Sequence, residues 1–295
     1  MRLTALLPII CCSAALILSF LCLFAGHKKD FMEDYALLTL NTSRIGEGIV
    51  DSTLASSSSP VSDLWNLVPD SIQDDVTEIA GTVTEKIGIE DFYSAHLLDY
   101  CFGQYTPAEA PNATLSSKDI DKNVTDCSDQ RAMFWFDPQV ILEEALNKTG
   151  LGITLQDLKW PEDIQRGLDA LRIVSITSFV LYCISIALIF LALVAALPAL
   201  FAQGRLAACL NLMIAILAFL AIGLASALVT AVLVKGTNVI NQYGNDIGVQ
   251  AKRGNKFLAL TWAATALMLI TLVAWSVEIC FGHRKSRTTY VSKHG

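Results

Sequence analysis

The sequence lacks the residue patterns on which most enzymes and metal proteins depend. It has only four histidines, and no Cys-x-x-Cys, His-Glu-x-x-His or glycine-rich phosphate loop. Ser94, His96 and Asp99 suggest a catalytic triad, but triad members meet through the fold and not through adjacency in sequence. The segment from Asp119 to Asn123 starts like a calcium loop, without its glycine at position six or glutamate at twelve. We therefore predict no enzyme, no metal site and no cofactor.

Charge is also missing from four long apolar segments. Hydrophobic residues make up 53% of the chain and the mean hydropathy is +0.50, which is too high for an ordinary soluble domain. About 20 apolar residues cross a hydrocarbon core, so each segment is long enough to span a membrane. A channel or pump would need ionisable groups inside the bilayer, so transport is disfavoured. The segments are Leu3–Ala25, Ile173–Ala202, Leu206–Val234 and Phe257–Val277.

The order of apolar and polar segments predicts a membrane protein with one large loop. The predicted parts are a first transmembrane helix over 1–26, a glycosylated acidic extracellular loop domain over 27–172, a second helix over 173–202, a cytoplasmic turn over 203–205, a third helix over 206–234, a short extracellular loop over 235–256, a fourth helix over 257–281 and a basic cytoplasmic tail over 282–295. The first segment could instead be a cleaved signal peptide, but no small-x-small site precedes His27.

The large loop has features of a protein surface outside the cytoplasm. It holds 26 Asp and Glu against 11 Lys and Arg, which disfavours binding to nucleic acid. Its two cysteines, Cys101 and Cys127, are expected to pair in an oxidising compartment. Four sequons are glycosylation sites, with acceptors Asn41, Asn112, Asn123 and Asn147. Basic residues are equally numerous on the two sides of the membrane, so they do not indicate an orientation. The sequons and loop cysteines predict a multi-pass plasma-membrane protein with both termini cytoplasmic.

Hydrophobic spacing predicts that the loop domain is mostly helical. Ile72, Val76, Ile79 and Val83 form one helical stripe. Asp137 and Pro138 start a second helix that ends near Gly150, and a third starts near Trp160 and runs into the second span. The aromatic patch over 87–106 is expected to form the core of this domain. We therefore predict an all-α membrane protein, a four-helix bundle with a disulfide-linked helical loop domain in a claudin-like layout.

Small and polar residues in the third span predict how the bundle packs. Gly223, Ala227 and Ala231 recur at four-residue spacing, which lets helices approach closely, within the bundle or in a dimer. Asn211 is expected to hydrogen-bond to a neighbouring helix. Cys280 precedes the basic tail and is a candidate for S-acylation.

Several stretches together resemble a known family. They are Asp91–Tyr105, Pro111–Thr114, Asn123–Ser128, Phe136–Pro138, Trp160–Asp163, Gly204–Asn211, Gly244–Gly248 and Phe257–Trp262. With them the chain is similar to a fungal four-span family that comprises actin-cortical-patch (Sur-seven) proteins and PalI-type pH-response regulators. Claudins share this layout, but the loop has no Trp-x-x-Cys, so junction sealing does not carry over.

The resemblance implies a non-enzymatic organiser of static cortical, eisosome-associated microdomains, linked to endocytosis and cell-wall integrity. The PalI branch implies instead an accessory subunit of an ambient-pH sensing receptor complex, for which His96 and the acidic clusters are the candidate titrating groups. The expected partners are membrane lipids, other membrane or cortical proteins, the cell wall and a second copy of the chain.

Overall fold

The chain divides into two compact units. The bundle unit consists of Met1–Phe24, Thr177–Thr230 and Phe257–Gly295, and the sheet unit of Ala25–Ile176 and Ala231–Lys256. The computed structural model describes residues 5–29, 31–45, 88–106, 120–149, 154–156, 162–199 and 205–281. The predicted helix over residues 72–83 and the basic tail lie outside these ranges.

Four long helices each contain a candidate membrane span. They are α1 (Leu6–Phe24), α6 (Glu162–Ala199), α7 (Arg205–Gly244) and α8 (Asn255–Phe281). Helix α6 begins well before its apolar segment, and helix α7 continues about ten residues beyond the end of its apolar segment. The polar residues of both extensions are compatible with the backbone hydrogen bonds of an α-helix. The protein is therefore a multi-pass membrane protein whose second and third spans extend as helices into the sheet unit.

Small residues let the helices of the bundle unit pack closely. A buried cluster joins Ala5, Ala196, Ala199 and Ala215 to the ring of Trp275. Lipid is as apolar as leucine, so helices in a membrane associate by close van der Waals packing and by hydrogen bonds. Larger apolar side chains such as Phe190 and Leu224 are exposed on the outside of the helices, where lipid would contact them.

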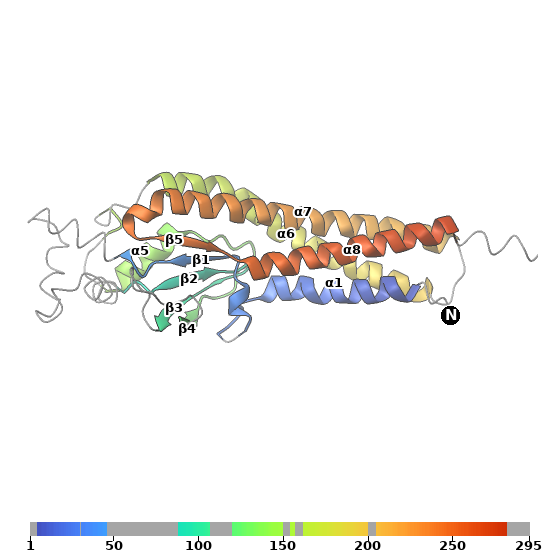
Figure 1. Cartoon of the computed structure of the whole chain (residues 1–295), viewed down its shortest axis with the longest axis horizontal. Helices are drawn as coiled ribbons and strands as arrows, with labels where there is room; N and C mark the ends of the chain where they lie inside the picture. The colour runs from blue at the N-terminus through green and yellow to red at the C-terminus, as the bar shows by residue number, and fades with distance from the viewer. Residues whose placement is uncertain are drawn as a thin grey trace, which may run out of the picture. The chain divides into compact units, whose positions relative to one another are not determined.

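The loop domain is built on a five-stranded antiparallel sheet (Figure 1). The strand order is β4 (Asp121–Cys127), β3 (Tyr100–Thr106), β2 (Phe92–Ala95), β1 (Leu38–Asn41) and β5 (Gln250–Arg253). The fifth strand comes from the short loop between the third and fourth spans, and it pairs with β1 from Leu38↔Arg253 to Asn41↔Gln250. The two loops therefore form one domain on the same side of the membrane.

The prediction of a mostly helical loop domain was wrong. Side chains alternate across strands, and in β3 Cys101, Gly103 and Tyr105 are buried while their neighbours are more exposed. For this segment the sequence predicts a core but no strands. In β4 only Val124 is buried, so this strand resembles a polar loop in sequence. Pairing with β3, and not local propensity, makes it a strand.

Two of the predicted helices are present. Helix α6 begins at Glu162 and runs into the second span, as predicted from the start near Trp160. Helix α5 (Pro138–Thr149) begins after Asp137, whose carboxylate accepts a hydrogen bond from the Val140 amide at 3.4 Å. Proline fits the first helical position because its missing N–H would have no partner there. Short 3-10 turns at Glu33–Tyr35 and Asn245–Ile247 lie just before β1 and β5 respectively.

Candidate functional site

A disulfide joins the edge strand of the sheet to its neighbour. Cys101 on β3 and Cys127 on β4 are directly opposite each other in the antiparallel register, and their Cα atoms are 4.0 Å apart. Cys101 is fully buried together with Phe92 and Tyr105. A crosslink that closes a loop of 26 residues lowers the entropy of the unfolded chain, worth about 3 kcal/mol. The disulfide therefore holds a polar strand on the sheet.

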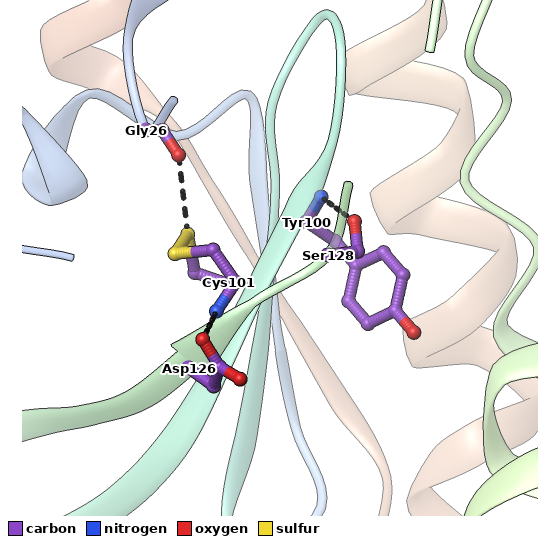
Figure 2. The surroundings of a disulfide bond; sticks show 6 residues. Gly26, Tyr100, Cys101, Asp126 and Ser128 are labelled. Carbon is purple, nitrogen blue, oxygen red and sulfur yellow. Dashed lines mark hydrogen bonds between the residues drawn. A yellow bond between two sulfur atoms is a disulfide. The ribbon is translucent and has the colours of Figure 1, made fainter. Parts of the chain in front are cut away.

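Three contacts surround this disulfide (Figure 2). The Tyr100 amide donates to the Ser128 hydroxyl at 3.1 Å, and the Cys127 amide donates to the Asp126 carboxylate at 2.8 Å. The Cys101 sulfur lies 3.3 Å from the carbonyl oxygen of Gly26. This is a van der Waals contact and not a hydrogen bond, because the sulfur of a disulfide carries no hydrogen. The disulfide is thus in direct contact with the segment that follows α1.

His96 lies in the turn between β2 and β3, against the same glycine. Its side chain is 3% exposed, and within the described part of the chain neither ring nitrogen has a hydrogen-bond partner. Burial, with a smaller contribution from the Lys122 ammonium, lowers the pKa of His96 from 6.5 to about 4. The imidazole is therefore neutral at ordinary external pH, because a buried charge without a partner is costly.

Asp99 closes the same turn. The His96 amide donates to the Asp99 backbone carbonyl at 2.9 Å, while the Asp99 carboxylate is buried without a close hydrogen-bond partner. Burial raises the pKa of Asp99 from 3.8 to about 7, and the nearby Gln130 side chain opposes this rise. Near neutral pH this carboxyl is therefore close to the midpoint of its titration.

Ser94, His96 and Asp99 do not form a catalytic relay. The Ser94 hydroxyl pairs with Thr39 on β1 at 3.3 Å, and within the described residues His96 donates no hydrogen bond to it or to Asp99 from its ring nitrogens. The Lys122 ammonium lies 3.3 Å from the same Thr39 hydroxyl and 5.2 Å from the centre of the Phe92 ring. Within the described residues, no group of three or more His, Cys, Asp or Glu could hold a metal ion.

The predicted glycosylation sites have different surroundings. Asn41 is 2% exposed at the end of β1, and its side-chain oxygen accepts hydrogen bonds from the Ser43 amide and hydroxyl. Asn123 is exposed on the edge strand β4, and Asn147 is exposed on α5. Asn112 lies outside the described residues. A glycan fits the two exposed positions but not the buried Asn41 of the folded sheet.

The predicted small-residue face of the third span is only partly packed within the bundle, and its alternative, packing in a dimer, stays a prediction. Ala227 and Ala231 are exposed on α7, while Ala218, Ala225 and Ser226 are buried. Gly223 is half-buried, and a Cβ placed on it would meet Thr265 at an ordinary 3.7 Å.

Asn211 also differs from its prediction. Its side chain is buried, but its amide nitrogen donates to Ala207 of its own helix at 2.9 Å. Its amide oxygen is buried without a partner, so no hydrogen bond to a neighbouring helix is seen. Cys280 is exposed near the end of α8, as an acylation site requires.

Sequence reasoning missed a cluster of buried hydroxyls in the bundle unit. Ser226 on α7 lies 2.6 Å from the hydroxyl of Thr261 and 2.9 Å from that of Thr265, both on α8. The Tyr182 hydroxyl on α6 hydrogen-bonds to Thr261. These four residues, which we call the hydroxyl cluster, join three spans. Thr261 and Thr265 at four-residue spacing were the available signal, because such residues share one helix face.

A family model matches residues 4–274, which include all five strands and almost all of the four long helices. The chain belongs to the SUR7/PalI family. This is a family of membrane proteins with no known catalytic role. The match includes the disulfide, the turn with His96 and Asp99, and the hydroxyl cluster. No curated protein and no solved structure matches the chain.

Proposed function

We propose that this protein is a non-enzymatic organiser of static cortical microdomains of the plasma membrane, associated with eisosomes and linked to endocytosis and cell-wall integrity. Membership of the SUR7/PalI family over residues 4–274 carries the proposal. In this role the spans interact with lipids and other membrane proteins, and the sheet unit faces the cell wall or partner ectodomains. Both termini are cytoplasmic.

Two features of the structure support an organising role. Exposed apolar side chains occur on all four spans, so each span has a surface for lipid or for another membrane protein. Ala227 and Ala231 add small exposed residues on α7, where a second helix could approach closely. The sheet unit in turn exposes charged positions on β4 and β5.

Live imaging with photobleaching tests this function. A C-terminally tagged copy should form stable cortical patches whose fluorescence does not recover, while a single-span anchor with the same tag should recover. Deletion should weaken growth under cell-wall stress. A uniform, mobile surface signal of the folded protein would contradict the organiser role.

The alternative is an accessory subunit of an ambient-pH sensing receptor complex. The observation that favours it is the buried Asp99, whose pKa of about 7 lets a change in external pH alter its charge. Deletion should then impair alkaline growth and signalling, and Asp99→Asn should not restore them. The exposed Asp129→Asn is the matched control, and it should restore both. Normal alkaline growth and signalling after deletion would exclude this role.

A further inference from the structure

Each of the four spans carries an exposed basic residue where it enters the sheet unit. These residues, which we call the cation belt, are Lys28 and Lys29 after α1, Arg172 in α6, Lys235 in α7 and Lys256 in α8. All five belong to the sheet unit. These basic residues at the ends of the spans differ from the rest of the large loop, in which most charged residues are acidic.

The belt residues lie where the lipid-facing surface of each span ends. Ile173 is 75% exposed and directly follows Arg172, so the surface of α6 changes from apolar to charged within one residue. On α7 the exposed Ala231 lies one turn before Lys235. Long basic side chains extend from such positions into the headgroup layer while their stems remain in apolar surroundings. Basic side chains at these positions are suited to contact lipid phosphates.

Four of the five cations are available for a ligand. Lys256 pairs with Asp34 at 2.5 Å and lies 5.9 Å from the centre of the Tyr35 ring. In the part of the chain that the structure describes, Lys28, Lys29, Arg172 and Lys235 form no ion pair. An unpaired cation at a membrane surface attracts anionic headgroups, and nearby charges dominate because salt screens charges beyond about 8 Å.

Membrane insertion does not account for these charges. In the orientation that we propose, the belt lies outside, whereas the positive-inside rule places Lys and Arg on the cytoplasmic side. Basic residues on the outer side disfavour this orientation during insertion, so insertion does not explain their presence. We propose that the cation belt binds the anionic, phosphate-bearing headgroups of lipids in the leaflet on the sheet side. This inference rests on the proposed orientation of the chain and is independent of the organiser role.

Lipid retention by the purified full-length protein tests the belt. The protein is incubated in mixed micelles of phosphatidylinositol and phosphatidylcholine, and the retained lipids are measured by mass spectrometry. The native chain should enrich phosphatidylinositol. The variants Arg172→Gln and Lys235→Gln should each lower that enrichment about fivefold, from about 1 kcal/mol per cation. Lys148→Gln is the control, since it removes one exposed charge from α5, which is outside the four span segments of the sequence, and it should have no effect.

Three results would overturn the proposal: no enrichment by the native chain, an equal loss with Lys148→Gln, or displacement of the lipid by inorganic phosphate at the same concentration. The last result would mean that the belt is a site for free phosphate. Thermal unfolding of each variant shows whether it is folded, and a Lys28→Gln, Lys29→Gln double variant replaces any that is not.

Discussion

The imidazole of His96 lies directly against Gly26, so a Cβ on that glycine would come within 2.4 Å of three ring atoms. Gly26 has a φ of +75°, its amide donates to the Phe31 carbonyl at 3.0 Å and its carbonyl contacts the sulfur of Cys101. One residue thus links the end of the first span to the turn of His96 and to the disulfide.

Replacing this glycine should destabilise the sheet unit. Gly26→Ala introduces a clash with His96 and a left-handed backbone that costs a residue with a Cβ about 1–2 kcal/mol. Thermal unfolding of the purified protein should show a lower midpoint. Gly223→Ala is the control, because its Cβ meets Thr265 at an ordinary distance and alanine favours a helix by up to about 1 kcal/mol. An unchanged midpoint for Gly26→Ala would contradict the contact with His96.

Replacing either cysteine of the disulfide should have the same effect. Cys101→Ser and Cys127→Ser should each lower the free energy of unfolding by about 3 kcal/mol and reduce surface delivery equally. Cys209→Ser is the control, because this cysteine is free and exposed. Surface biotinylation and non-reducing gels measure the result. Normal delivery of either variant would show that the disulfide is dispensable for folding.

Glycan occupancy should follow exposure. Asn123→Gln and Asn147→Gln should each increase gel mobility by one glycan, while Asn41→Gln should not, because Asn41 is buried between β2 and β5. The Asn41 side chain also accepts two hydrogen bonds from Ser43. A mobility shift in Asn41→Gln that matches the shift produced by glycosidase treatment would show that β1 is not buried in this way.

The two orphaned side chains should give stability opposite dependences on pH. Between about pH 4 and 7 the folded protein binds more protons at Asp99 than the unfolded chain does, so the free energy of unfolding falls as pH rises, by up to about 1.4 kcal/mol per unit. Between about pH 4 and 6.5 the unfolded chain binds more protons at His96, so that contribution rises with pH.

Single variants separate the two contributions. Asp99→Asn should leave the His96 effect alone, so stability should rise from about pH 4 to 6.5. His96→Asn should leave the Asp99 effect, so stability should fall from about pH 4 to 7. Unfolding midpoints across this range measure both slopes. Parallel curves for the two variants would contradict the assigned burial.

The hydroxyl cluster should stabilise the bundle unit more than an isolated hydroxyl does. Ser226→Ala removes the contacts with Thr261 and Thr265 on α8 and should cost about 1 kcal/mol, within the range for hydrogen bonds between membrane helices. Ser276→Ala is the control, because its hydroxyl donates to Leu272 of its own helix. Unfolding by SDS titration compares them. Equal losses would show that the cluster adds nothing beyond local hydrogen bonding.

The spans could be predicted from the sequence because their signal is local. About twenty consecutive apolar residues without charge require a helix, since every backbone polar group in lipid needs an internal partner. The helix that starts at Pro138 was equally local, through its cap. The sheet could not be predicted in this way. Strands β4 and β5 are polar and lack a clear alternation of buried and exposed side chains, and β5 lies about 200 residues from its partner β1.

By itself, the sequence determined the four spans, the absence of known catalytic motifs, the family, and which two loop cysteines were available to pair. Only the tertiary structure decided that both loops share one sheet, that the side chains of His96 and Asp99 are buried, and that hydroxyls rather than Ala227 and Ala231 face the neighbouring helices. The physical reason is that helix formation in lipid depends on neighbouring residues, whereas strand pairing and burial depend on segments that only the fold brings together.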